Sequence, residues 1–297
     1  MPPKPRIDAF GAISLTGFAV LLAFNQVVIK VVNEGLQPVF FAGLRSLGGA
    51  ILIFGWMRLR GIALTLPRNT LVPGILMGGL FALEFVCLFW ALDLTTVTRT
   101  SVIFYTMPMW MALGAHFFIP GDRLTTAKSA GLALAFAGVV IALTLRGEGG
   151  EASLLGDLLA LAGAMGWAGL ALMARGTALR DVRPEVQLLW QLTISAPLLL
   201  LAALFFGPLL RDPEFIHWAG LGFQTVIIVS AGFLFWPWLL SIYPPSSVAA
   251  FSFLTPVFGV LLGWLMLGDE VGLGILIALA LVCSGLILIN KPKRASG

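Results

Sequence analysis

The sequence has few charged residues, few tyrosines and no long polar segment. Only 11% of its 297 residues are charged, against 59% hydrophobic, and it contains two Tyr, two His and two Cys. A soluble domain has about 25% charged residues and roughly half apolar ones, so this composition excludes a soluble fold. Cys87 and Cys283 lie at unrelated depths of apolar segments. They predict neither a disulfide nor a thiolate metal site, and we expect no metal or cofactor.

Several motifs of catalysis and energy coupling are also absent. There is no Gly-x-x-x-x-Gly-Lys-Ser/Thr phosphate loop, no His-Glu-x-x-His and no Gly-x-Ser-x-Gly. The first absence argues against ATP as the direct energy source, and the others leave metal and nucleophile chemistry without support. The sequence therefore does not predict an enzyme. An intramembrane enzyme acting on lipid-linked substrates is the alternative from another class, but it needs Asp or His pairs that the apolar segments lack.

What the sequence does contain is ten apolar segments, each close to the roughly 20 residues that cross a bilayer. They lie at 9–32, 38–58, 70–91, 95–118, 126–145, 154–175, 185–206, 217–239, 246–267 and 271–290. Among the Lys and Arg residues of the connections, only Arg146 and Arg211 fall on the side opposite the termini. This asymmetry predicts an all-α inner-membrane protein with both termini in the cytoplasm.

The second half of the sequence repeats motifs of the first. Leu88-Phe89-Trp90 recurs as Leu234-Phe235-Trp236, and Gly121-Asp122 recurs as Gly268-Asp269. Five spans in each half is an odd number, so the second copy enters the membrane in the opposite orientation, as in secondary transporters. We therefore predict ten transmembrane helices in two inverted five-helix repeats around a central cavity. The predicted units are a first repeat at 1–146, a glycine-rich linker at 147–153 and a second repeat at 154–297.

Charged groups are costly inside a bilayer, so those within the spans are candidates for coupling or gating. They are Lys30, Arg45, Glu84 and Arg99. A rise of about 1.5 Å per residue places Arg45 and Glu84 at nearly the same depth, which makes a salt bridge between them plausible. Glu84 is then a proton-coupling group, a partner for a substrate amino group, or half of a permanent ion pair. Lys30 and Arg99 lie nearer the surface, where snorkelling also accounts for them.

Polar and aromatic residues of the spans predict a substrate pocket. The candidate contacts are Asn25, Gln26, Ser101, Tyr105, Trp167, Trp190, Gln191, Phe251 and Thr255. Their rings suit flat apolar side chains and organic cations, or they simply fill space between helices. Pro108 and Pro256 stand mid-span at matching positions and predict kinks, which act as hinges or are only structural. Small residues such as Gly259 and Gly263 predict close helix packing.

Several of these motifs together form a family pattern. They are Phe24-Asn25-Gln26 leading to Lys30, Pro38-x-x-Phe-Ala-x-x-Arg45, a mid-span Pro, and Gly121-Asp122-Arg123-Leu124-Thr125. With them the chain resembles the EamA-type branch of the drug/metabolite transporter superfamily over positions 10 to 290. The resemblance implies export of amino acids, metabolites or drugs by alternating access, and the polar pattern is most similar to bacterial aromatic amino acid exporters.

Two further expectations concern what the protein binds. A small-multidrug-like exporter of cations is the alternative within transport. The expected partners are a small-molecule substrate and membrane lipid, with no nucleic acid and no obligate protein partner.

Overall fold

The structure is a computed structural model that describes residues 7–64, 67–145, 153–243, 248 and 250–290. Within these residues every named element is a helix, and the β pairing found there is one isolated bridge between Leu36 and Leu210. Seven helices are long and apolar enough to cross a membrane, and shorter apolar helices accompany them. The predicted all-α class is therefore confirmed. Apart from Ser153, the predicted linker lies outside the described residues.

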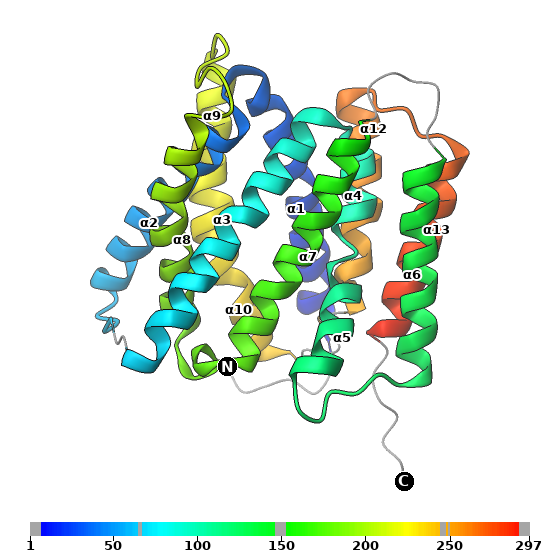
Figure 1. Cartoon of the computed structure of the whole chain (residues 1–297), viewed down its shortest axis with the longest axis horizontal. Coiled ribbons are helices and arrows are strands. Elements are labelled where there is room, and N and C mark those ends of the chain that lie inside the picture. Colours follow the sequence, from blue (N-terminus) through cyan, green and yellow to red (C-terminus); the bar gives the residue numbers. More distant parts are fainter. Residues whose placement is uncertain (1–6, 65–66, 146–152, 244–247, 249, 291–297) are drawn as a thin grey trace.

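The helices of the first half are spread across the bundle, interleaved with those of the second half (Figure 1). They are α1 (Ala9–Gly35), α2 (Pro38–Leu59), α3 (Leu71–Leu94), α4 (Val97–Phe104), α5 (Met107–Phe118) and α6 (Thr126–Thr144), with the 3-10 turn η1 (Arg68–Thr70) before α3. Side-chain caps explain where several of them begin. The hydroxyl of Thr96 accepts a hydrogen bond from the Arg99 N–H at the start of α4, and Thr125 does the same for Lys128 at α6.

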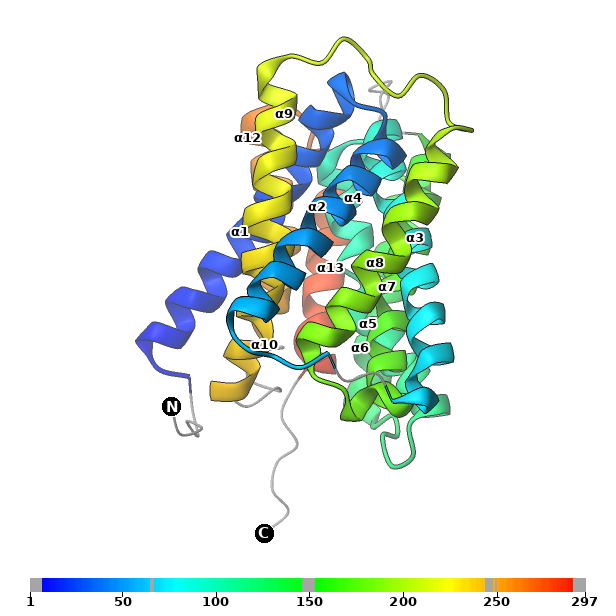
Figure 2. The ribbon, with the colours of Figure 1, turned by 90° about the vertical axis from the view of Figure 1, so that its left-hand side faces the viewer.

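The second half is less regular. Its helices are α7 (Leu154–Gly176), α8 (Pro184–Ala203), α9 (Phe215–Phe223), α10 (Phe233–Ile242), α12 (Leu254–Leu267) and α13 (Leu273–Ile289). A 3-10 turn, η2 (Ala178–Asp181), precedes α8, and another, η4 (Ala250–Phe253), precedes α12. A π-helix, η3 (Gln224–Gly232), joins α9 to α10. A π-helical segment is rare and often marks a functional position. Figure 2 shows α9 beside α1.

Both predicted kink positions coincide with helix breaks. The segment predicted as one span at 95–118 is two helices, α4 and α5, and Pro108 lies in the first turn of α5. Pro256 lies in the first turn of α12, directly after the 3-10 turn η4. Proline is tolerated there because first-turn N–H groups have no partner within the helix. The predicted distortions are confirmed, whereas a hinge role for either proline stays a prediction.

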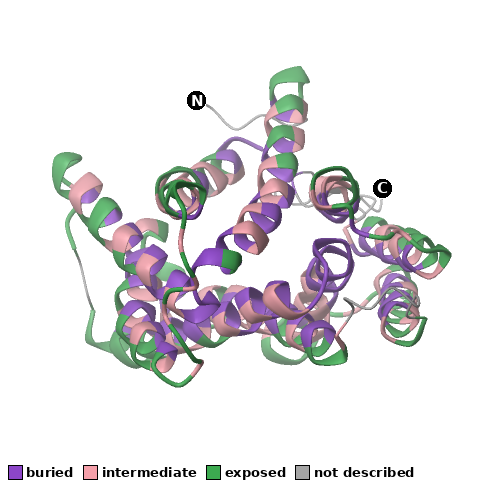
Figure 3. Cartoon of the chain, turned by 90° about the horizontal axis from the view of Figure 1, so that it is seen from above, coloured by how far each residue is buried: buried purple, intermediate pink, exposed green. Residues whose placement is uncertain are grey.

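Close helix packing depends on small residues, as predicted. Helices α6 and α13 pair at one edge of the bundle (Figure 1), where a Cβ on Gly131 would come within 2.7 Å of the Gly285 carbonyl oxygen. A Cβ on Gly259 would overlap the side chain of Ser101. Seen from above, buried residues gather on the helix faces turned toward the interior (Figure 3). The hydrophobic effect does not hold helices together within lipid, so close van der Waals packing of this kind stabilises their association.

Candidate functional site

Helix α1 carries polar side chains on two neighbouring flanks in the interior of the bundle. On one flank the Ser101 hydroxyl of α4 donates to Gln26 Oε1 at 2.5 Å, and the Tyr105 hydroxyl donates to the Leu22 carbonyl at 3.1 Å. Gln26, Ser101 and Tyr105 are all buried. Three of the predicted contacts therefore lie together where α1 meets α4, and α12 packs against Ser101 through Gly259.

The other flank of α1 leads to a buried cation through a residue that sequence reasoning missed. Gln224, at the start of the π-helix, donates from Nε2 to the side-chain oxygen of Asn25. Its Oε1 lies 3.5 Å from Nη1 of Arg45 on α2. Gln224 is fully buried, and Arg45 is 1% exposed. The sequence did contain a signal for Gln224, because a polar glutamine stands out within the apolar segment 217–239. These residues link α1, α2 and η3 by polar contacts.

The predicted salt bridge between Arg45 and Glu84 is wrong. The guanidinium of Arg45 instead lies over the rings of Phe85 and Phe89, at 3.8 Å and 5.0 Å from their centroids. Glu84 is also buried, and its Oε1 has no hydrogen-bond partner. Its side chain faces α7, where a Cβ on Gly166 would come within 3.0 Å of it. Because adjacent residues on a helix point about 100° apart, the Phe85 ring and not Glu84 meets the cation.

Arg99 is not a snorkelling surface residue. It forms a buried ion pair with Asp157 in the first turn of α7, with Nη2 and Oδ2 2.7 Å apart. It also donates to the Ala142 carbonyl at the end of α6, while the Thr95 hydroxyl donates to Asp157 at 3.1 Å. Arg99 therefore connects α4, α6 and α7. Sequence reasoning missed Asp157 because it lies four residues after the glycine-rich linker and resembles the polar start of a span.

The aromatic residues predicted to form one pocket are divided by α3, which lies between α7 and α8 (Figure 1). On the α7 side, the ring of Trp167 lies 5.4 Å from that of Phe104. On the α8 side, the Trp190 ring packs where a Cβ on Gly74 would come within 2.8 Å of it. Gln191 donates to the Met77 sulfur at 3.3 Å. Trp190 and Gln191 thus lie between α3 and α8, away from the Gln26–Ser101 pair.

The two remaining candidates belong to the last part of the chain. Phe251, in η4, packs against a cluster that includes Leu15 and Tyr243. Thr255 is buried in the first turn of α12, one helical turn before Gly259. Thr255 therefore lies one turn before the glycine that packs on Ser101. Phe251 instead packs beside the first part of α1, where Leu15 lies.

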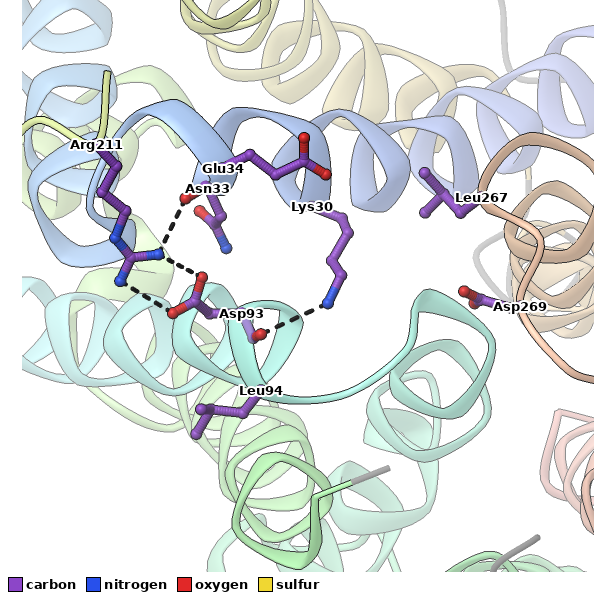
Figure 4. A pocket seen from close by; sticks show the side chains of 8 residues that line it. All are labelled: Lys30, Asn33, Glu34, Asp93, Leu94, Arg211, Leu267 and Asp269. Carbon is purple, nitrogen blue, oxygen red and sulfur yellow. Dashed lines mark hydrogen bonds and ion pairs between the residues drawn. The ribbon is translucent and has the colours of Figure 1, made fainter. Parts of the chain in front are cut away.

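A cavity of about 540 Å³ opens at the end of the bundle where α1 and α3 end (Figure 4). Its lining is Lys30, Asn33, Glu34, Asp93, Leu94, Arg211, Leu267 and Asp269. Of these, only Lys30 was a predicted site residue. This volume lies within the roughly 300–1,000 Å³ of small-molecule sites. The other charged residues sit at span ends or in connections, where charge is ordinary, so their position in the sequence carried no signal.

Arg211 and Asp93 close one wall of this cavity. The guanidinium holds both carboxylate oxygens, at 2.7 Å and 3.1 Å, and also donates to the Asn33 carbonyl at 3.0 Å (Figure 4). On another wall, Asp269 accepts from the Thr98 N–H at 2.7 Å. That contact places a carboxylate at the start of α4, where the helix dipole favours negative charge.

Asp122, the sequence counterpart of Asp269, has different neighbours. Lys128 lies 2.9 Å away and Arg175 of α7 lies 3.4 Å away, and all three side chains are at least partly exposed. The hydrogen bond from Lys128 holds the pKa of the Asp122 carboxyl below its usual value, and the positive charges of Lys128 and Arg175 act in the same direction. Asp122 itself lies in the connection between α5 and α6, whereas Lys128 lies in the first turn of α6 and Arg175 in the last turn of α7.

Comparison with known proteins finds relatives that are named as an efflux pump and as an exporter. The chain is 30% identical over 270 residues to an Escherichia coli protein named "Probable amino-acid metabolite efflux pump", which covers 84% of this chain and 85% of that one. It is 32% identical over 141 residues to "Aromatic amino acid exporter YddG" of Ancylobacter novellus, which covers 46% and 47%. A solved structure described only as a crystal structure of a protein matches with a TM-score of 0.66 and 24% identity, over 94% of this chain and 96% of the other. That last likeness supports the fold alone.

The family assignment follows from a match that covers most of the sequence. The EamA-like transporter family matches the chain twice, over residues 9–144 and again over 154–291. Both matched segments line the cavity, since Lys30 and Asp93 come from the first and Arg211 and Asp269 from the second. The family and the named relatives are transporters and exporters, not enzymes. The chain therefore belongs to the EamA-like transporter family and is a membrane transporter.

Proposed function

We propose that the protein is a secondary exporter of the inner membrane that moves amino acids or similar small amphipathic solutes by alternating access. The observation that carries this proposal is the cavity between the two matched segments, which is lined by charged groups from both. A cavity at such an interface opens or closes when the two units move relative to each other. The names of the Escherichia coli and Ancylobacter relatives favour amino acids, including aromatic ones, as the solutes.

The proposed architecture has ten membrane crossings in two inverted repeats, 1–146 and 154–297, joined by the linker at 147–153. In this count α4 with α5, α9 with η3 and α10, and η4 with α12 are each one broken crossing. The directions of α1 and α7 support inversion. Lys30, near the end of α1, donates to the Thr95 carbonyl, and the Thr95 hydroxyl donates to Asp157 at the beginning of α7. The first helices of the two segments therefore run in opposite directions (Figure 1).

The distribution of Lys and Arg supports cytoplasmic termini. On that orientation the cavity at the ends of α1 and α3 faces the outside and is the exit of the transport route. The beginning of α1 and the end of α13 lie together at the opposite end of the bundle (Figure 1). The buried polar contacts of Asn25, Gln26, Ser101 and Tyr105 lie between these ends, and we propose that solute passes beside them, with Trp167 as an aromatic contact.

Glu84 is the proposed coupling group. Its carboxylate is buried, lacks an ion pair among the described residues and faces α7 of the other matched segment. Burying an unpaired carboxylate is costly, and acids of this kind mark proton pathways in transporters. Arg45 lies nearby on α2 but binds Gln224 and aromatic rings, so it does not neutralise Glu84 by direct contact.

The test is transport in proteoliposomes with an imposed pH gradient. We expect the wild-type protein to move amino acids faster when the gradient is present, and we expect Glu84→Gln to lose that acceleration. Glu270→Gln, an exposed acid in a connection, is the matched control and keeps it. If Glu84→Gln transports at the wild-type rate under every gradient, the coupling role is wrong. If an organic cation moves and no amino acid does, the cation-exporter alternative replaces the proposed function.

A further inference from the structure

Most charged groups of the cavity are already occupied by partners within the protein. Both carboxylate oxygens of Asp93 are held by Arg211, and Oδ2 of Asp269 is held by the Thr98 N–H. These groups shape the walls of the cavity. They offer little to a ligand, because a ligand would have to displace an existing charge-assisted hydrogen bond.

Three polar groups on α1 are not occupied in this way. The Lys30 ammonium donates only to neutral acceptors, the carbonyls of Thr95 at 3.1 Å and Asp93 at 3.5 Å. The Glu34 carboxylate is exposed and forms no ion pair within the described part of the chain. Asn33 is 1% exposed, and its Oδ1 has no hydrogen-bond partner, although its Nδ2 donates to the Phe89 carbonyl. A buried acceptor without a partner is unusual and calls for a ligand or water.

The spacing of these groups fits a small ligand that carries both charges. Positions i, i+3 and i+4 share one face of a helix, with Cβ atoms about 5–6 Å apart. Figure 4 shows the two charged side chains leaving α1 in different directions, with the Lys30 ammonium toward Asp93 and the Glu34 carboxylate away from it, and both line the cavity. Two lining residues are apolar, Leu94 from the end of α3 and Leu267 from the end of α12. The cavity thus offers a cation, an anion with a neutral acceptor, and an apolar surface.

We propose that this cavity binds the zwitterionic head of an α-amino acid with an apolar side chain. Lys30 binds the carboxylate, Asn33 Oδ1 and Glu34 accept hydrogen bonds from the ammonium, and Leu94 and Leu267 contact the side chain. The proposal rests on the proposed function and adds to it a solute site at the exit. A purely structural role for Lys30, which places a cation at the C-terminal end of α3, predicts changed stability without changed ligand selectivity.

The experiment compares three ligands on the purified full-length protein. Radiolabelled phenylalanine is displaced by phenylalanine, by phenethylamine, which lacks the carboxylate, or by N-acetylphenylalanine, which lacks the ammonium. We expect the wild-type protein to prefer phenylalanine at least tenfold over both analogues. Lys30→Gln removes the preference over phenethylamine, and Glu34→Gln removes the preference over N-acetylphenylalanine. Lys30→Arg retains the cation and the selectivity, and Asp212→Asn, exposed at the same end but outside the lining, retains all preferences.

Several outcomes would overturn the proposal. If both glutamine variants discriminate like the wild-type protein, or if the wild-type protein binds neither phenylalanine nor leucine, the cavity does not recognise a zwitterion. If Lys30→Gln does not fold, Glu34→Gln and Lys30→Arg still decide the question. Proteoliposome export measured in parallel separates the two proposals. Export with wild-type KM in both glutamine variants overturns this site and leaves the proposed function standing, whereas selective binding without export overturns the proposed function.

Discussion

Two ion pairs join the matched segments at the same end of the molecule, and they differ in their access to water. Arg99 and Asp157 are 2.7 Å apart, and their side chains are 5% and 0% exposed. Arg211 and Asp93 are also 2.7 Å apart, but their side chains are 35% and 18% exposed. The distances are equal, so geometry alone does not distinguish the pairs. The pairs differ in solvation. If the second pair separates, water can solvate its charges, whereas water has no access to the charges of the first pair.

This difference assigns different mechanical roles to the two pairs. Separating Arg99 from Asp157 leaves a charge in a low-dielectric interior, so α4 and α7 are expected to stay together throughout a transport cycle. Separating Arg211 from Asp93 costs much less, so this wall of the cavity is the part expected to open. The two matched segments are then expected to move about the buried pair and to separate at the partly exposed one.

The largest expected effect is on the buried pair. Asp157→Asn leaves the Arg99 guanidinium buried without an anion, and removal of one partner of a buried pair costs roughly 3–5 kcal/mol. We expect a loss of this size in the free energy of unfolding, measured by denaturant titration in mixed micelles. Asp93→Asn is the matched control, with an expected loss below about 1 kcal/mol.

A double variant separates burial of charge from packing. Replacing Arg99 and Asp157 together by leucine removes both charges, and such replacements are often neutral or stabilising. We expect the double variant to be more stable than Asp157→Asn alone. Equal stability of the two would mean that packing and the Thr95 and Ala142 hydrogen bonds hold this region together, and the comparison between the pairs would lose its basis.

Sequence reasoning located the helices but not the partners of their charges. Depth along a helix follows from counting residues, so Arg45 and Glu84 were correctly placed in the interior. Their pairing depends on rotation about each helix axis, which packing decides, and the rings of Phe85 and Phe89 meet Arg45 instead. The same limit explains Arg99, whose depth near a span end suggested snorkelling. Its burial comes from α7, on the far side of the linker.

The residues of the candidate site also fall into two groups, those that the sequence predicts and those that it does not. Asn25, Gln26, Ser101 and Tyr105 could be predicted because polar side chains stand out within apolar spans, and the structure brings them together around α1. Apart from Lys30, the charged lining of the cavity could not be predicted. Its members lie at span ends and in connections, and only the three-dimensional meeting of α1, α3 and α12 makes them neighbours.

The next effect in size concerns Asp269, which links the segments by a single hydrogen bond to the first turn of α4. Loss of a capping acceptor costs about 0.5–2 kcal/mol, so we expect Asp269→Ala to lower the free energy of unfolding by this amount. Asp269→Asn keeps an acceptor oxygen and is expected to lose less. Should the alanine variant unfold like the wild-type protein, this contact contributes nothing to joining the segments.

The partly exposed pair of Arg211 and Asp93 should matter more for transport than for stability. Arg211→Gln is expected to lower the free energy of unfolding by less than about 1 kcal/mol, because such pairs contribute little in water. The same variant should change the transport rate, since it removes the contact that closes one wall of the cavity. Exchanging the two charges, with Arg211→Asp and Asp93→Arg together, should bring the rate back toward that of the wild-type protein. A large loss of stability in Arg211→Gln would contradict the distinction between the two pairs.

The smallest effect is expected at Asp122, the exposed counterpart of Asp269, whose pKa is lowered mainly by the hydrogen bond from Lys128. A carboxyl with a lowered folded-state pKa stabilises the protein above its unfolded-state pKa, and this stabilisation disappears as the pH falls through the folded-state pKa. The wild-type protein should therefore be more stable than Asp122→Asn at pH 7, by less than about 1 kcal/mol. The difference should vanish in acid, below the ordinary value of 3.8. A difference that stays constant with pH would mean that the asparagine disturbs the turn itself. The measured difference would then not report the ion pair between Asp122 and Arg175, which we expect to be a weak, solvated contact between the two matched segments.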